Sequence, residues 1–240
     1  MGASAGVGRA LSEALAAQGS PLLIAATDAR DLAAQAQHLR LQFGIDVVTV
    51  VLDARQLEAS VTSLIAVARQ LGDINSLYFP IGVSMDDDTA DSVSLAATIA
   101  LLNVNLGIVI AVTTAMLPEL RRLPAARVVG FGSIASSRGR SNNVVYSAAK
   151  RALESFFESL RHATTGSCIR VHFIKLGYVA TQQTFGKKLL FPVVSPQRVA
   201  QHAIKVASRD RGPHYYPGYW LAVTTVLKYL PWRLFKRLRF

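Results

Sequence analysis

The hydrophobic positions of the chain fall into short runs that alternate with longer amphipathic stretches. Branched aliphatic runs occupy residues 21–27, 47–52, 76–83, 126–133 and 169–177. Stretches rich in Ala and Leu with helical spacing lie at residues 7–18, 31–43, 57–71, 95–121, 147–163 and 196–208. Such alternation is typical of a parallel sheet covered by helices on both faces. We therefore predict a single α/β domain with a Rossmann-like, doubly wound parallel sheet.

The composition agrees with a globular domain in a reducing compartment. Of the 240 residues, 51% are hydrophobic and 17% are charged, which excludes intrinsic disorder for most of the chain. Cys168 is the single cysteine, so the chain can form no internal disulfide and we expect a cytoplasmic protein. The N-terminus has no basic region followed by an apolar run, so we predict no secretory signal.

The longest uncharged segment, residues 92–118, is long enough to span a bilayer. Asn103 and Asn105 lie near its centre, where polar side chains are costly in lipid. A buried helix in a large core accounts for the same run. We expect a core helix here, with a transmembrane helix as the alternative.

The positive charge is concentrated at the C-terminal end. Of the net charge of +11, residues 1–158 contribute −2 and residues 159–240 contribute +13. Residues 211–240 contain six Lys or Arg and no acid. We therefore divide the chain into a dinucleotide-binding domain, residues 1–210, and a basic amphipathic extension, residues 211–240. No recognised nucleic-acid-binding module accompanies the charge, so we predict no nucleic-acid partner.

A glycine-rich loop, GASAGVG, opens the chain directly before a helical stretch. Gly2, Gly6 and Gly8 allow a tight turn and let backbone amides approach a pyrophosphate at the helix N-terminus. A plain strand-to-helix turn is the alternative. Such a motif should follow a strand, but only Met1 precedes it in the given sequence, so we expect the first and most central strand of the sheet to be missing from this chain. Either the start is misplaced or truncated, or this form is an incomplete domain.

A serine, a tyrosine and a lysine are spaced for proton transfer. Tyr146 and Lys150 are four residues apart, on one face of a predicted helix, and Ser133 ends a predicted strand. A neighbouring ammonium lowers the pKa of a phenol, which is ordinarily near ~10. Tyr146 could then protonate a carbonyl oxygen that Ser133 also hydrogen-bonds. An exposed Tyr–Lys pair on a surface helix is the alternative.

These motifs occur together and in order along nearly the whole chain. The glycine loop, Asp53, the NVNLG segment around Asn105, Ser133 and the YSAAK segment of residues 146–150 resemble the short-chain dehydrogenase/reductase family. The resemblance implies nicotinamide-dependent reduction of a ketone. It implies catalytic roles for Asn105, Ser133, Tyr146 and Lys150, with Asn105 supporting a proton-relay water and Lys150 also holding the nicotinamide ribose.

The same resemblance implies the cofactor-binding residues. These are Gly2, Ser4, Gly6, Val7, Gly8, Asp28, Asp53, Gly82, Tyr146, Lys150, Gly177, Val179 and Thr181. The chain departs from the family at residues 79–82, which read Phe-Pro-Ile-Gly instead of Asn-Asn-Ala-Gly. It departs again at residues 176–177, which read Leu-Gly instead of Pro-Gly. We predict no metal site.

The charge of Asp28, directly after the predicted strand at residues 21–27, bears on the choice of cofactor. A carboxylate at Asp28 accepts from a free ribose hydroxyl and repels a 2′-phosphate, so it favours NAD(H) over NADP(H). Arg30 could still reach across to a phosphate. Asp28 could also be a helix N-cap, for which Asp is favoured.

The C-terminal extension combines apolar and basic positions. A stripe at helical spacing precedes Pro231, and afterwards Leu234, Phe235 and Leu238 share a face with basic residues between them. The stripe consists of Trp220, Val223, Leu227 and Leu230, and the basic residues are Arg233, Lys236, Arg237 and Arg239. This pattern is typical of a helix lying in a membrane surface, so we predict membrane contact through residues 219–240. Packing on the domain or on a partner subunit is the alternative.

The extension together with SIASSRGRSNNVVYSAAK is similar to one branch of the family, the decaprenylphosphoryl-2-keto-pentose reductases of bacterial cell-surface polysaccharide synthesis. This similarity implies a lipid-linked keto-sugar as substrate and a peripheral location on the inner face of the cell membrane. The alternatives are a general ketone or 3-oxoacyl reductase acting on a small molecule, and a non-catalytic membrane-associated scaffold. Lys187 and Lys188 suit either a substrate phosphate or solvent. Helices 95–121 and 147–163 resemble the pair through which family members form homodimers and homotetramers.

Overall fold

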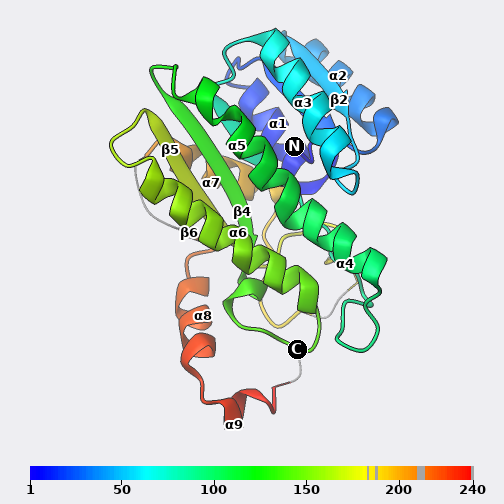
Figure 1. Ribbon diagram of the computed structural model, residues 1–240, viewed down its shortest axis with the longest axis vertical. Coiled ribbons are helices and arrows are strands. Elements are labelled where there is room, and N and C mark those ends of the chain that lie inside the picture. The colour runs from blue at the N-terminus through cyan, green and yellow to red at the C-terminus, as the bar shows by residue number, and fades with distance from the viewer. Residues whose placement is uncertain (183, 187–188, 210–213, 239–240) are drawn as a thin grey trace.

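The computed structural model describes residues 1–182, 184–186, 189–209 and 214–238. It shows parallel strands flanked by helices on both faces, so the predicted α/β class is confirmed (Figure 1). The strands are β1 (Leu22–Ala26), β2 (Val47–Val51), β3 (Ser76–Phe79), β4 (Ala126–Ser133), β5 (Ile169–Leu176) and β6 (His214–Tyr216). The strand β6 was not predicted, because its three residues, His-Tyr-Tyr, form no aliphatic run.

The helices follow the predicted amphipathic stretches closely. They are α1 (Gly6–Ala16), α2 (Ala29–Phe43), α3 (Leu57–Leu71), α4 (Leu95–Leu102), α5 (Ile108–Leu120), α6 (Val144–Ala163), α7 (Pro196–Ala207), α8 (Trp220–Tyr229) and α9 (Trp232–Phe235). A π-helical turn, η1 (Asn103–Gly107), joins α4 to α5, and a 3₁₀ turn, η2 (Ile134–Ser137), follows β4.

The sheet is in two pieces. Strands β1 and β2 pair in parallel, and β3, β4, β5 and β6 form a second parallel sheet in that order. Between β1 and β3 lies a cavity of about 490 Å³, which we call the strand slot. The chain begins at one end of this slot, where the Met1 amino group donates to the carbonyl oxygen of Tyr78 at 3.0 Å. The Gly2 amide donates to the carbonyl oxygen of Ala25 at 2.8 Å.

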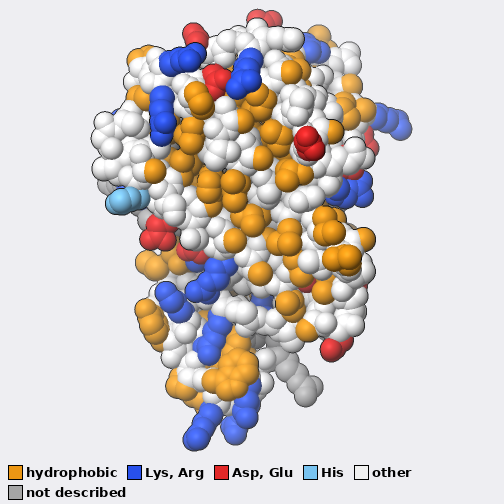
Figure 2. Space-filling model, in the orientation of Figure 1, with side chains coloured by type: hydrophobic (Ala, Val, Ile, Leu, Met, Phe, Trp, Pro, Cys, Tyr) orange, Lys and Arg blue, Asp and Glu red, His pale blue; other side chains and the backbone are white. Residues whose placement is uncertain are grey.

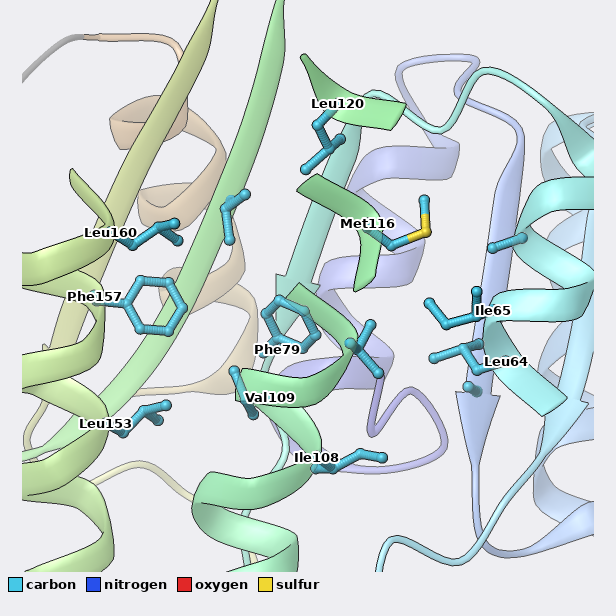
Figure 3. Packing of buried hydrophobic residues seen from close by; sticks show 14 of the residues in the cluster. Leu64, Ile65, Phe79, Ile108, Val109, Met116, Leu120, Leu153, Phe157 and Leu160 are labelled. Atoms are coloured by element: carbon cyan, nitrogen blue, oxygen red, sulfur yellow. The ribbon is translucent and has the colours of Figure 1, made fainter. Parts of the chain in front are cut away.

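Apolar side chains pack on both faces of the larger sheet. On one face, α3, α5 and α6 contribute residues such as Leu64, Met116 and Phe157, and Phe157 packs under β4 (Figure 3). On the other face, α7 packs against β4 and β5 and α1 packs against α7, with Leu11 and Val199 in one apolar cluster. Strands β4 and β5 are buried along most of their length, which explains their nearly continuous apolar sequence.

The long apolar run contains a helical segment, Leu95–Leu120, that is long and apolar enough to cross a membrane by its length and composition. Buried core helices of globular proteins share this length and composition. Here α5 buries Val109, Val112 and Met116 in the core, and η1 interrupts the α-helical geometry near the centre. The core-helix prediction therefore describes the packing of α5 better than the transmembrane alternative.

The C-terminal extension is attached to the body at specific points and then projects from it (Figure 1). Helix α8 packs against η2 and β6. The Arg138 guanidinium donates to the carbonyl oxygens of Leu227 and Leu230 and lies 3.9 Å over the ring of Phe235. The predicted domain boundary at residues 210–211 and the basic residue Arg239 lie outside the described residues.

Candidate active site

The site forms where parallel strands end on one side of the sheet. Strand β4 ends at Ser133, the segment after β3 carries Gly82, and Gly177 follows β5. Helix α6 begins close by and presents Tyr146 in its first turn. Because parallel strands all end on the same side of a sheet, residues far apart in sequence meet there.

Tyr146 and Ser133 form the centre of this group. Burial raises the pKa of the Tyr146 phenol, while a hydrogen bond with Ser133 and the positive charge of Arg140 oppose that shift. The Ser133 hydroxyl also accepts from the amide of Ala135 at 3.1 Å, which fixes its position at the start of η2. The phenol therefore remains protonated in this environment and is suited to donate a proton.

Lys150 lies one helical turn after Tyr146 and is 3% exposed. Its Nζ donates to the carbonyl oxygens of Ile81 at 3.1 Å and Phe131 at 3.4 Å, and lies 6.0 Å from the Tyr146 ring centroid. Burial lowers the pKa of Lys150 to about 8. The prediction that Lys150 lowers the pKa of Tyr146 is wrong for this structure. The ammonium faces backbone carbonyls and loses solvation, so burial decides both pKa shifts.

Asn105 is fully buried in the π-helical turn η1. Its side-chain amide donates to the carbonyl oxygens of Val83 at 2.8 Å and Leu101 at 3.0 Å, and its Oδ1 accepts from the Val83 amide at 3.2 Å. π-helical turns often occur at functional sites, where they redirect one side chain. Here Asn105 ties the segment after β3 to the end of α4.

Gly82 explains why the segment after β3 can pass so close to these groups. A Cβ atom at this position would lie 3.0 Å from both Asn105 Oδ1 and Lys150 Nζ. Any side chain would therefore push the two polar groups apart. Gly82 thus marks the point where Asn105 and Lys150 come together.

The start of α6 is held by a carboxylate from a different part of the chain. Asp88 is 1% exposed, and its two oxygens accept from the amides of Val145 at 2.8 Å and Tyr146 at 2.9 Å. The residue in the N-cap position, Asn143, has a left-handed φ of 60° and makes no side-chain capping bond. Asp88 therefore serves as the cap and fixes the backbone that carries Tyr146.

Arg140 brings positive charge to the same region. It is partly buried, and burial lowers the pKa of its guanidinium while the neighbouring Tyr178 and Tyr146 phenols oppose that shift. The proximity of Arg140 to two phenols makes the site electropositive beside the proton donor.

The glycine loop has the geometry of a phosphate cradle. A Cβ atom at Gly8 would lie 1.8 Å from the carbonyl oxygen of Gly2, so only glycine permits this turn. Helix α1 begins at Gly6 without a side-chain cap, which leaves its first amides directed at the loop. The Thr181 side chain lies directly beside Gly6, and the Arg9 guanidinium donates to the carbonyl oxygen of Ser4 at 2.6 Å.

The remaining predicted cofactor residues have additional structural roles. Asp28 caps α2, because its carboxylate accepts from the Asp31 amide at 2.8 Å. This is the N-cap role that the sequence offered as the alternative to a contact with the cofactor ribose. Asp53 forms a salt bridge of 2.6 Å with Arg55. Two of the predicted cofactor residues are apolar and belong to the core. Val179 is buried in the apolar cluster formed with α1 and α7, and Val7 packs against that cluster. Lys187 and Lys188 lie outside the described residues.

Trp220, in the first turn of α8, lies against the loop that follows β5. A Cβ atom at Gly177 would overlap its indole, and the Tyr178 and Phe191 rings are 5.4 and 4.7 Å from the indole between centroids. The extension thus forms part of the wall beside the predicted cofactor loop. The sequence identified Trp220 only as a member of an apolar stripe.

Sequence reasoning missed Asp88 and Arg140 as members of this site. Asp88 ends a run of three aspartates that resembles a solvated acidic loop, and nothing in the run distinguishes it from Asp86 and Asp87. Arg140 stands in a polar loop between Ser133 and Tyr146. Only the tertiary contacts reveal what either residue faces.

The sequence profile of the short chain dehydrogenase family matches residues 1–188, and the chain belongs to this family. An uncharacterized oxidoreductase of Mycobacterium tuberculosis (strain H37Rv) is 27% identical over 97% of this chain and 92% of its own length. A 3-oxoacyl-[acyl-carrier-protein] reductase of Haemophilus influenzae is 26% identical over 76% of this chain and 74% of its own. The protein is therefore an oxidoreductase of the short-chain dehydrogenase/reductase type.

Solved structures show the same fold. A structure from a study of 7β-hydroxysteroid dehydrogenase stereoselectivity superposes with a TM-score of 0.85 at 17% identity, covering 96% of this chain and 90% of that one. The L-sorbose reductase of Gluconobacter frateurii, complexed with NADPH and L-sorbose, superposes with a TM-score of 0.79 at 18% identity, covering 89% of this chain and 92% of that one.

Proposed function

We propose that this chain reduces a ketone to a secondary alcohol with NAD(P)H, and that Tyr146 is the proton donor. The observation that carries the proposal is the grouping of Ser133, Tyr146 and Lys150 beside Asn105. Ser133 is hydrogen-bonded to Tyr146, and Lys150 and Asn105 both lie next to Gly82. The glycine loop fits a dinucleotide, because its close turn directs the first amides of α1 at a pyrophosphate.

A nicotinamide dinucleotide bound at the glycine loop would supply the hydride for the carbonyl carbon. Tyr146 donates its proton to the carbonyl oxygen, and the Ser133 hydroxyl hydrogen-bonds the same oxygen. The raised pKa of Tyr146 keeps the phenol protonated, as reduction requires. Lys150, with a pKa of about 8, supplies a nearby group that can replace the lost proton. Asn105 holds the segment after β3 beside Lys150.

The proposed cofactor-binding residues are those expected from the sequence, with Lys150 on the ribose and Thr181 near the nicotinamide. The charge of Asp28 favours NAD(H), although the same carboxylate caps α2 and the sorbose reductase is complexed with NADPH. Comparison of kcat/KM for NADH and NADPH decides the preference. A value at least about tenfold higher for NADH, abolished in Asp28→Asn, is the result expected if Asp28 selects the cofactor.

The test of the enzymatic proposal is oxidation of NADH or NADPH in the presence of a panel of ketones. Tyr146→Phe should lower kcat by about 10²- to 10⁴-fold, because it removes the proton donor, and should leave dinucleotide binding intact. Tyr229→Phe is the matched control, since Tyr229 is 75% exposed on α8. Unchanged turnover in Tyr146→Phe would refute the assigned role, and a chain that binds neither dinucleotide would support the scaffold alternative.

For the substrate, we propose a lipid-linked keto-sugar that is presented at a membrane surface. The support is the extension, whose outward face carries large exposed apolar side chains. These are Leu221, Val226, Tyr229, Trp232, Leu234 and Leu238, each at least 45% exposed. Basic side chains surround them on the projecting lobe of α8 and α9, where no acidic side chain is visible (Figure 2). Each basic residue near an anionic leaflet contributes about 1 kcal/mol of attraction.

This arrangement divides the extension into two faces. The inner face, with Trp220 and Thr224, is buried against the body. For this face, the predicted alternative of packing on the domain applies. The outer face combines aromatic and aliphatic side chains with Arg233, Lys236 and Arg237. An amphipathic segment of this composition binds in the interfacial plane of a bilayer.

Co-sedimentation with vesicles of phosphatidylglycerol and phosphatidylcholine tests the membrane contact. The whole chain should sediment with anionic vesicles at low salt, and Arg233→Glu/Arg237→Glu should abolish this. Arg121→Glu/Arg122→Glu, an exposed pair after α5, is the matched charge control. Deletion of residues 219–240 is less informative, because it also removes Trp220 from Gly177. Full retention of the whole chain in the supernatant would contradict the membrane proposal and leave the reductase proposal standing.

A 3-oxoacyl reductase is the second candidate, favoured by the 26% identity to the Haemophilus influenzae enzyme. Turnover of a 3-oxoacyl thioester at a higher kcat/KM than that of any keto-sugar would identify the chain as a 3-oxoacyl reductase.

We further propose a cytoplasmic location at the inner face of the membrane. A homodimer or homotetramer through helices 95–121 and 147–163, which form α4 to α5 and α6, is also proposed, supported by the exposed side chains of Leu95 and Ile99 on α4. Analytical ultracentrifugation measures the oligomeric state.

A further inference from the structure

Helix α8 connects two segments that carry residues of the candidate site. At its N-terminal end, Trp220 packs against Gly177, which directly follows β5. At its C-terminal end, it is bound by Arg138, the residue directly after η2. Strand β6 runs parallel to β5 and leads into α8, so the extension leaves the body at the end of the sheet where the site lies (Figure 1). The extension therefore contacts the segments that follow both β4 and β5.

Arg138 makes the contact at the C-terminal end of α8. Its guanidinium donates to the carbonyl oxygen of Leu227 at 2.7 Å and to that of Leu230. The last carbonyls of a helix have no partner within the helix, and a positive charge there is favoured by the helix dipole. The same guanidinium lies 3.9 Å over the ring of Phe235, a buried residue of α9. One side chain thus holds both helices of the extension to the body.

The turn that precedes Arg138 also fixes the position of Ser133. The Ser133 hydroxyl accepts from the Ala135 amide at 3.1 Å, and the Ser133 carbonyl oxygen accepts from the Ser136 hydroxyl at 2.7 Å. On its other side, η2 is bound to α6, because Arg151 donates to the last two carbonyl oxygens of η2 at 3.4 and 3.2 Å. The turn is therefore held between α6 and the extension.

We propose that Arg138 is a positioning residue for the reductase site and that, through it, the extension holds Ser133 beside Tyr146. This inference rests on the proposed reductase function. Ser133 hydrogen-bonds the Tyr146 phenol and, in the proposed reaction, the carbonyl oxygen of the substrate. A shift of η2 therefore weakens the interactions of the transition state more than the binding of the dinucleotide. An arginine suits this role, since its planar guanidinium can bind two carbonyl oxygens and stack on a ring at once.

Turnover, dinucleotide affinity and hydrogen exchange of Arg138→Ala test this role. The kcat should fall by about tenfold or more, because a small displacement of reacting groups has a large effect on rate. The Kd for NADH or NADPH should stay within about twofold of the parent value. Exchange of the Ala135 amide, which bonds the Ser133 hydroxyl, should become faster. Arg138→Lys keeps the charge without the planar fork, so it should recover only part of kcat.

Arg170→Ala is the matched control. Arg170 also donates to a backbone carbonyl oxygen beyond the end of a helix, that of Ser208 at 3.4 Å, but it lies at the opposite end of β5 from Gly177. Its kcat and Ala135 exchange should equal those of the parent. A parent without turnover on any ketone would mean that the reductase function fails. Unchanged kcat in Arg138→Ala of an active parent, or unchanged Ala135 exchange, would overturn the positioning role.

Phe235→Leu reaches the same contact from the extension and is the milder variant if Arg138→Ala fails to fold. It removes the ring beneath the guanidinium and keeps an apolar side chain, so kcat should fall by about two- to fivefold. When it is combined with Arg138→Ala, kcat should equal that of Arg138→Ala alone, since both changes remove one contact. Effects that multiply would show that Arg138 acts independently of the extension and would overturn the proposal, as would unchanged kcat in Phe235→Leu.

Discussion

Lys150 shows how a single residue can work against the stability of the fold it belongs to. Its ammonium is buried and donates to the carbonyl oxygens of Ile81 and Phe131, and burial lowers its pKa to about 8. Groups with strongly shifted pKa values in a cleft are candidates for functional roles. The same burial means that the protonated form is disfavoured in the folded chain relative to the unfolded chain.

The first prediction follows from that difference. Between a folded pKa of about 8 and an unfolded value near ~10.4, the unfolded chain binds more protons, so stability rises with pH across this window. Below pH 8 the folded chain carries the full free-energy cost of burying the protonated Lys150 side chain. Lys150→Met should therefore raise the free energy of unfolding by about 1–3 kcal/mol at pH 7, with the gain shrinking as pH rises from 8 toward 10.4.

Urea denaturation of the two proteins at pH 7, 8, 9 and 10 measures this effect. Lys228→Met, at an exposed position of α8, is the control and should show no pH-dependent difference from the parent. A Lys150→Met protein that is less stable than the parent at pH 7 would mean that the lost hydrogen bonds outweigh the desolvation of the ammonium. Turnover should be lost in the same variant.

At the scale of elements, the site depends on where α6 begins. Its own N-cap residue, Asn143, makes no side-chain capping bond, and Asp88 supplies the carboxylate from the loop after β3. That loop is therefore bound to the first turn of α6, which carries Tyr146. Asp88 acts as a positioning residue, since it contacts the backbone of Tyr146.

The second prediction is that Asp88→Ala lowers kcat by about tenfold or more, because a small displacement of a proton donor has a large effect on rate. The free energy of unfolding should fall by about 1–2 kcal/mol, the usual cost of losing a helix cap. The Kd for the dinucleotide should stay within about twofold of the parent value.

Two variants separate positioning from a general loss of structure. Asp87→Ala removes an adjacent exposed carboxylate and should leave kcat unchanged. Asp88→Asn retains one acceptor oxygen and should recover part of kcat. If kcat in Asp88→Ala equals that of the parent while stability falls, Asp88 stabilises α6 without positioning Tyr146.

At the scale of the whole molecule, a histidine cluster lies where the body meets the extension. His202 on α7 stacks on Tyr216 of β6 at 4.2 Å between ring centroids, and His214 lies 6.1 Å from His172 of β5 and 6.3 Å from His202. Strand β6 leads directly into α8. The connection between sheet and extension thus rests on aromatic rings that can become charged.

The third prediction concerns the pH dependence of that connection. Burial, with the nearby His214 and Lys205, lowers the pKa of His202 below its ordinary 6.5. As pH falls below 6.5, the unfolded chain binds the proton before the folded chain does, so stability is lost over this window and is fully retained above it. The melting temperature should fall between pH 7 and 5, and hydrogen exchange in β6 and α8 should increase first.

His202→Gln removes the titrating ring and should flatten the pH dependence between pH 7 and 5. His38→Gln, on the exposed face of α2, is the control and should leave the profile unchanged. A parent protein whose melting temperature is constant across this range would contradict the prediction.

The periodicity of the sequence was sufficient to predict most of the architecture. Five of the strands and the helices of the body lie within a few residues of the runs that predicted them, because buried parallel strands and amphipathic helices have distinct apolar periods. The spacing of Tyr146 and Lys150 and the order of the motifs also follow from the sequence. The short strand β6 and the π-helical turn at Asn105 do not, because neither has an apolar period of its own.

Tertiary structure decided what each polar group faces. Asp88 and its exposed neighbour Asp87 have the same side chain, and only the fold places one of them against the amides of α6. Burial, which sequence does not give at a single polar position, raises the pKa of Tyr146, where the sequence predicted a lowered value, and lowers the pKa of Lys150. Local pattern thus determined which elements form, whereas the distances and solvation at the site depend on contacts between segments far apart in the chain.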